Sequence, residues 1–343
     1  MMRLPLSWLL CLTGGALALL LVGSLATGPM ALSFGESLRA LFAGQGSGIE
    51  AHKLLIVQEI RLPRTLLCIA VGGILGLCGA VMQGLFRNPL ADPGIIGVSG
   101  GAALGAALAI VLLAPLGQQW QSLLGIGLLP LLAFLGGALT TTLVYLLGTR
   151  EGGTSVTVML LAGVAVTALS GAVIGLLTYL ADDQMLRNLS LWQMGSLAAG
   201  KPVDVALALL TLVALLILFL RDANPLNALL LGEGEARHLG IQVQSLKRRL
   251  ILLTAAGVGV AVAVAGMIGF VGLVVPHLVR LLAGPNHVRL LPLSALLGAA
   301  LLLGADMLAR TLLAPAEMPV GIITALLGAP FFIWLLVKGR RTF

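Results

Sequence analysis

Charge is scarce in this sequence: only 10% of its 343 residues are Asp, Glu, Lys or Arg. A water-soluble domain carries charged side chains at about a quarter of its positions. That charged shell is missing here. Its absence excludes a soluble globular protein and indicates a surface that faces lipid.

Cysteine is also rare. The three cysteines, Cys11, Cys68 and Cys78, each lie within an apolar run. This arrangement fits neither a disulfide framework nor metal-ligand spacing. We therefore expect small buried packing residues and predict no metal site.

Hydrophobic residues (59%) and glycine (45 residues) are abundant, and the mean hydropathy is +1.09. Glycine suits close helix packing in lipid, where no hydrophobic force drives helices together. The apolar stretch after Arg3 is too long for a cleaved signal core of about 7–15 residues, so it predicts a retained span. At about 20 apolar residues a span, the candidates are 8–30, 65–86, 94–115, 123–148, 156–180, 203–220, 250–268, 270–283, 290–309 and 319–337.

Two stretches need division. The uncharged stretch 93–149 is too long for one helix and breaks at a polar run, 117–121. The stretch 250–283 is either one long bent helix or two spans divided near 266–272. The count is therefore nine or ten, and ten fits the loop charges better. We predict an all-α, polytopic integral membrane protein with a single transmembrane domain over residues 1–343.

With ten spans and both termini inside, inside segments hold thirteen of the twenty basic residues. This bias is typical of cytoplasmic loops and explains the net charge of +7 without nucleic-acid binding. Arg61, Arg64 and Arg310 fall outside, against the trend. Asp306 and Arg310 are four residues apart near the outer end of the ninth span, where mutual neutralisation is expected.

A weak internal similarity suggests a sequence repeat. Gly79 precedes Pro89, and Gly266 precedes Pro276, by the same number of residues. An inverted repeat of spans 2–5 and 7–10, as in many transporters, would explain it.

Two loops are long enough to hold structure. The outside loop 31–63 has room for a surface helix, and the inside loop 221–249 contains a short polar stretch, 231–240, bracketed by glycines. One or two helical turns are not stable alone. The stretch fits either a short helical element held against a partner protein or an ordinary solvated loop.

Three matches to catalytic motifs are weak. Residues 195–202 lack the Ser or Thr that a phosphate-binding loop needs after Lys201. Residues 97–101 (Gly-Val-Ser-Gly-Gly) fit packing around a helix start better than a nucleophile elbow or a serine protease paired with His277. Asp182 and Asp183 have no second acidic cluster to complete a magnesium site. Asp92, between Pro89 and Pro93, predicts a sharp turn and a helix cap.

Together the motifs resemble the permease subunits of type II ABC importers for iron–siderophore complexes, hemin and vitamin B12. The matching stretches are 61–64, 79–83, 88–94, 160–165, 232–240, 269–277, 305–310, 317–321 and 328–330. The stretch 179–197 is most similar to the hemin branch. The resemblance implies a bacterial inner-membrane permease that forms a homodimer and works with two cytoplasmic ATPase subunits, which bind ATP-Mg, and a periplasmic binding protein. The chain itself would be neither an enzyme nor a cofactor carrier.

The resemblance also implies roles for single residues. Arg61, Arg64 and Arg310 would face the periplasm and dock the binding protein. The ATPase-coupling helix would comprise Gly232, Glu233, Glu235, Ala236, Arg237, Leu239 and Gly240, and the cytoplasmic gate Asn88, Leu90, Ser155 and Thr157.

The expected cargo is hemin or an iron–siderophore, carried by alternating access, with vitamin B12 as the alternative. None of His52, His238, His277 and His287 is an evident heme ligand. An ion-coupled secondary transporter is the competing class, but it needs ionisable residues near the midplane. Spans 2–5 contain no charge, and the charges of other spans lie near their ends.

Overall fold

Helices make up almost all of the chain in the computed structural model, which describes residues 5–30, 32–43, 50–114, 127–150, 153–198 and 200–339. Seven helices in this part are long and apolar enough to cross a membrane, and three shorter apolar helices join them. The long ones are α1 (Leu6–Ala26), a continuous helix ending in α4 (Leu62–Leu85), α7 (Leu128–Gly148), α8 (Val156–Leu180), α10 (Pro202–Arg221), α13 (Val243–Ala265) and α15 (His287–Thr311). The shorter ones are α5 (Val98–Val111), α14 (Val271–Ala283) and α16 (Val320–Gly339).

The ten helices overlap the ten predicted stretches, and seven of them are long enough to span a membrane, which confirms the polytopic all-α fold. The ambiguous stretch 250–283 is two helices, because the chain leaves α13 at Gly266 and α14 starts only at Val271. The predicted break at 117–121 lies outside the described residues.

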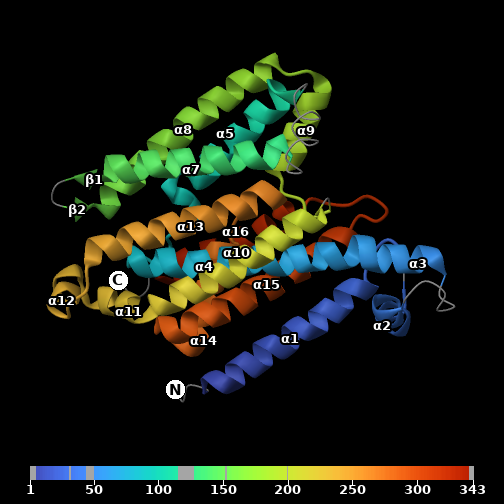
Figure 1. Cartoon of the computed structure of the whole chain (residues 1–343), viewed down its shortest axis with the longest axis horizontal. Helices are drawn as coiled ribbons and strands as arrows, with labels where there is room; N and C mark the ends of the chain where they lie inside the picture. Colours follow the sequence, from blue (N-terminus) through green and yellow to red (C-terminus); the bar gives the residue numbers. More distant parts are fainter. Residues whose placement is uncertain are drawn as a thin grey trace.

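The remaining elements lie at the two ends of the bundle (Figure 1). One end, here called the α9 end, holds α2, α3 and α9. The opposite α12 end holds α11, α12, the two strands and both chain termini. The bounds are α2 (Phe34–Phe42), α3 (Ala51–Leu55), the π-helical turn η1 (Ile56–Arg61), the 3-10 helix η2 (Pro93–Ile96), α9 (Asp183–Gln193), α11 (Ala223–Leu231), α12 (Glu233–His238), β1 (Thr149–Arg150) and β2 (Gly153–Thr154).

Local sequence explains several of these boundaries. Ser33 and Glu36 form a reciprocal capping box that starts α2, the surface helix expected in the outside loop. Asp92 accepts a hydrogen bond from the Gly94 N–H at 2.7 Å and caps η2, as the turn pattern predicted. The inside loop 221–249 is not a loop: α11, α12 and the start of α13 fill it with helix.

Helix α4 occupies the centre of the bundle. It packs against α10, α13, α14 and α15, and 89% of its span is buried. Glycines allow this close approach, since a methyl group at Gly79 would overlap the Gly272 carbonyl and one at Gly76 the Ser294 carbonyl. Cys68 and Cys78 lie in this core as predicted, whereas Cys11 is exposed on α1 and contradicts the expectation of burial.

Packing supports the inverted repeat. α4 lies against α14 and α15, and its counterpart α13 lies against α5 and α7. The helices of each half also pack together: α5, α7 and α8 in one, α14, α15 and α16 in the other. The similarity around Gly79 and Gly266 is not a structural equivalence, because Gly79 is inside α4 and Gly266 ends α13.

Candidate functional site

A cluster of charged side chains joins α4 to α15 at the α9 end. Arg64, near the start of α4, donates from Nε and Nη2 to the carboxylate of Asp306 on α15, at 2.9–3.1 Å. Its Nη1 donates to Glu317, in the connection between α15 and α16, at 2.7 Å. Arg310 lies 3.0 Å from the same Asp306 carboxylate, so this fully buried acid serves two arginines. The expected Asp306–Arg310 pair is therefore present, and Arg64 extends it.

The same arginines hold the end of α1. Arg310 donates to the Ser24 hydroxyl at 2.7 Å, and Arg61 donates to the carbonyls of Leu25 and Ala26 at 2.7 and 2.9 Å. The last carbonyls of a helix have no partner within the helix and carry partial negative charge. The guanidinium groups satisfy them and thereby fix α1 to the central bundle.

The three arginines expected to dock the binding protein lie together at one site. Arg61, Arg64 and Arg310 are at most 6% exposed, because their guanidinium groups are occupied within the chain. They do line a pocket of about 220 Å³ together with Glu317. Within the described part of the chain, Arg61 contacts carbonyl oxygens and no carboxylate. Their role in docking stays a prediction.

The expected coupling stretch folds as α12, at the opposite end. Gly232 and Gly240 flank it with φ of 128° and 81°, values that favour glycine. Ala236 is fully buried and anchors the helix, while Glu235 and Leu239 are exposed. Only one of the six residues of α12 is buried. Most of the helix is therefore open for contact with another protein.

A buried lysine connects α12 to the β1–β2 hairpin. Lys247 on α13 donates to the carboxylate of Glu233 on α12 and, at 3.0 Å, to the Thr154 carbonyl of β2. Gln244, one turn earlier, accepts from the Thr154 N–H at 3.0 Å. The sequence did not predict this link, because Lys247 belongs to a basic run and looks like any other cytoplasmic charge. The available signal was its place on the apolar helical stripe with Val243 and Leu250.

The four expected gate residues belong to two chain segments at the α12 end. The Asn88 side chain accepts from the Leu90 N–H at 2.9 Å in the turn after α4. Ser155 caps α8 and Thr157 lies in its first turn, both exposed. Their function as a gate stays a prediction.

The weak catalytic motifs have structural explanations. Gly97 adopts φ of 86° at the start of α5, and a side chain at Gly101 would overlap Thr140 of α7, so this motif packs a helix start as predicted. Asp182 caps α9 by accepting from the Met185 N–H at 2.8 Å. Pro202 begins α10. No group of three potential metal ligands occurs among the described residues.

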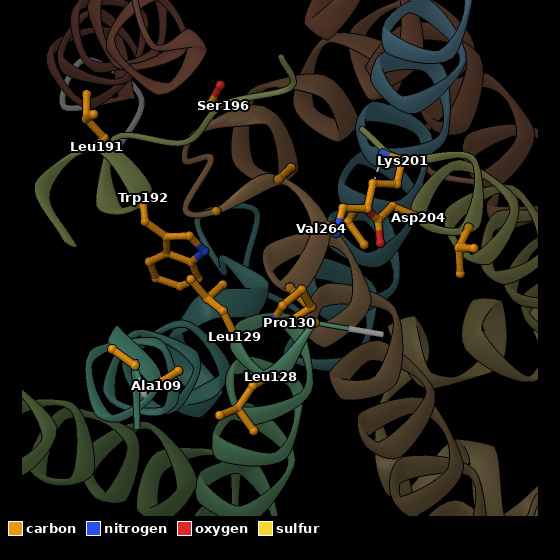
Figure 2. Close-up of a pocket in the computed structure, with 16 residues that line it drawn as sticks. Ala109, Leu128, Leu129, Pro130, Leu191, Trp192, Ser196, Lys201, Asp204 and Val264 are labelled. Carbon is orange, nitrogen blue, oxygen red and sulfur yellow. Dashed lines mark hydrogen bonds between the residues drawn. The ribbon is translucent and has the colours of Figure 1, made fainter. Parts of the chain in front are cut away.

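A cavity of about 550 Å³ lies between α5, α7, α10, α13 and the end of α9. Figure 2 shows the Trp192 ring among its lining residues, with Lys201 and Asp204 across from it. Ala114 and Gly127 also line it, and these residues flank 115–126, which lie outside the described part. We assign no ligand to this cavity.

Comparison with known proteins identifies the family of this chain. The model of the FecCD transport family matches residues 16–338. This chain belongs to the FecCD transport family. It is a membrane permease of the ABC importer class.

Relatives of this FecCD permease align over most of its length. The hemin transport system permease HmuU of Yersinia pestis is 47% identical and covers 99% of this chain and 97% of its own. The vitamin B12 import system permease BtuC of Escherichia coli is 42% identical, and the alignment covers 99% of this chain and 97% of that one. A solved structure described as an inward-facing metal-chelate type ABC transporter superposes with a TM-score of 0.82 at 34% identity, covering 96% of this chain and 98% of that one.

Proposed function

We propose that this permease passes hemin across the bacterial inner membrane. The observation that carries the proposal is the 47% identity to a hemin permease across almost all of both chains. Cobalamin is the second candidate, because permeases for vitamin B12 are 42% identical over the same extent.

The apolar surfaces suit a bulky cargo with little charge. A hollow of about 400 Å³ opens at the α9 end, lined by residues of which Gln193 alone has a polar side chain. The other lining residues are Met194, Met267, Gly321, Ile322, Ala325 and Leu326. Methionine adapts to irregular apolar partners without fixing them. Such a lining would let a planar cargo enter and leave.

The cargo path lies between two copies of the chain. Only 22% of the α8 span is buried. Gly171 and Gly175, one helical turn apart, face open space within one copy. Two glycines at this spacing are typical of helix–helix contacts in membranes. A second copy would cover this face.

The α12 end faces the cytoplasm and meets the ATPase subunits. Ten basic residues of the described chain belong to the connections and helix ends there, against seven at the α9 end, which fits the positive-inside rule. α12 presents Glu233, Glu235, Arg237 and Leu239 to the ATPase. Replacing Glu235 with Lys should uncouple hydrolysis from uptake, and Glu36→Lys, at the other end, serves as a control of equal charge change.

The α9 end receives the periplasmic binding protein. Its pocket holds three arginines and one acid, Glu317, with Asp306 just behind it, so one positive charge is unmatched. A carboxylate of the binding protein would enter and pair with Arg61. Arg61→Gln should weaken binding and reduce its salt dependence. Unchanged affinity at low salt would reject this docking mode.

Reconstitution tests the cargo. The permease and its ATPase are placed in liposomes with the cognate binding protein, and ATP hydrolysis and uptake are measured with hemin, cobalamin or a ferric siderophore. Hemin should stimulate both. Stimulation by cobalamin alone would reassign the cargo, and uptake driven by an ion gradient without ATP would reject the ABC importer mechanism for this chain.

A further inference from the structure

We infer that Lys247 is the residue that transmits movement of α12 to the start of α8, and thus couples the ATPase to the gate. This inference rests on the proposed function, because it assumes that α12 contacts an ATPase and that α8 lines the path. It adds a positioning residue and its two partners, Glu233 and Thr154.

The geometry makes Lys247 a shared partner. Its ammonium group contacts a side chain of α12 on one side and the backbone of β2 on the other. Lys247 is 2% exposed, whereas Glu233 is partly exposed. An ammonium buried in this way is costly unless its donors are paired. If α12 moves without the hairpin, one of the two contacts breaks and the buried charge loses a partner. The two elements are therefore held to move together.

The hairpin is stiff enough to pass the movement on. The Thr154 N–H is held by Gln244, and the hydroxyls of Thr149 and Thr154 lie 3.1 Å apart across the strands. The Ser155 N–H donates to the Gly148 carbonyl at 2.9 Å where the two strands join α7 and α8. Val156, the first residue of α8, follows directly. A shift of Thr154 therefore displaces the start of α8.

α8 is also free to respond. It packs on α5 and α7 along one side and is 22% buried, in contrast to the 67% of α13, which carries Lys247. Within one copy, α8 therefore has fewer contacts than α13 that would resist a shift of its start. Coupling is an energetic link between two sites, and the uptake per ATP hydrolysed measures it directly.

The test compares Lys247→Met with Arg249→Met in the reconstituted transporter. Both variants remove one positive charge and one ion pair from α13, but the Arg249 pair leads to Asp222 and does not reach the hairpin. Lys247→Met should lower cargo uptake per ATP hydrolysed by about fivefold or more, the lower range for coupling between sites. Arg249→Met should leave that ratio unchanged, and Lys247→Arg should recover part of it.

Two further measurements separate transmission from simple destabilisation. Glu233→Gln alone should lower the ratio, and Glu233→Gln with Lys247→Met should be no worse than Lys247→Met, since both act on one link.

Spin labels at Thr157→Cys in a Cys11→Ser background report the ATP-driven distance change between the two copies, which Lys247→Met should abolish.

The outcomes are distinct. Normal coupling in Lys247→Met, or equal loss in Arg249→Met, overturns the inference while the proposed function stands. A wild-type transporter that hydrolyses ATP without moving any cargo overturns the proposed function instead. If Lys247→Met fails to assemble, Glu233→Gln decides, because its partly exposed side chain tolerates the change.

Discussion

Helices α4 and α8 have the same mean hydropathy but opposite surroundings. The span of α4 is 89% buried within the chain and that of α8 is 22% buried. Glycines of the two helices show the difference: Gly72, Gly76 and Gly79 of α4 lie against the backbones of α14 and α15. Gly171 and Gly175 of α8 face open space. In a membrane, hydropathy reports only that a helix avoids water. Whether it meets protein or lipid depends on small residues and polar contacts.

This contrast suggests a division of labour. α4, fixed by the arginine cluster at one end and by close packing along its length, acts as the scaffold. α8, held mainly along one side, is suited to move and to meet a second copy. The following experiments test that division, beginning with the largest expected effect.

Asp306→Asn should destabilise the scaffold most. The variant removes the buried acid shared by Arg64 and Arg310 and leaves two guanidinium groups short of a partner, which costs about 3 kcal/mol or more. Thermal unfolding can be followed through a thiol-reactive dye, since Cys68 and Cys78 become accessible only on unfolding. A Cys11→Ser background removes the exposed thiol. An unchanged midpoint would show that the cluster is not what fixes α4.

Gly79→Ala should have the next largest effect. The added methyl group meets the backbone of Gly272, which cannot yield as a flexible side chain would, and overpacking of this kind costs about 2 kcal/mol. The same dye assay measures it. Gly175→Ala is the matched control on α8 and should leave the midpoint of the detergent-solubilised monomer unchanged. Equal effects at the two positions would contradict the contrast between the helices.

Gly171→Leu combined with Gly175→Leu should affect assembly rather than folding. Larger side chains on the open face of α8 would hold a second copy away, and each 1.4 kcal/mol lost weakens the dimer by about tenfold. Light scattering in detergent measures the dimer fraction. Gly14→Leu, also beside open space but on α1, should leave it unchanged. A dimer that persists in the α8 variant would place the interface elsewhere.

Glu36→Gln should have the smallest effect and shows what an exposed ion pair contributes. Hydrogen bonds from Lys53 and then Ser33 lower the pKa of Glu36 to about 2. A lowered pKa in the folded state stabilises the protein above the unfolded value of 4.5, and the contribution fades as pH falls from there toward 2. Wild type and variant should therefore differ slightly at pH 7 and converge at acid pH. A loss as large as that of Asp306→Asn would mean that burial is not the deciding factor.

Much of the fold could be predicted because membrane helices form locally. Each span must satisfy its own backbone hydrogen bonds in lipid, so length and hydropathy locate it. The predicted span 156–180 coincides with α8. Asp92 likewise caps its own turn. Predictions were poorer at the ends: α13 begins at Val243, before the predicted residue 250, because the charged run at its start still packs as helix.

The candidate site depended more on tertiary structure. Sequence identified Arg64 and Asp306 as unusual charges, but their partnership joins positions 242 residues apart. Lys247 and Thr154 are separated by 93 residues, and no local pattern links them.

The sequence by itself determined the class of the protein, the approximate positions of its spans and the residues that match its family. Only the tertiary structure decided which charges are buried, which helix is the scaffold and which face is left open. The physical reason is that backbone hydrogen bonding in lipid is satisfied within each helix, whereas the pairing of a buried charge and the fit of a glycine depend on which helices meet.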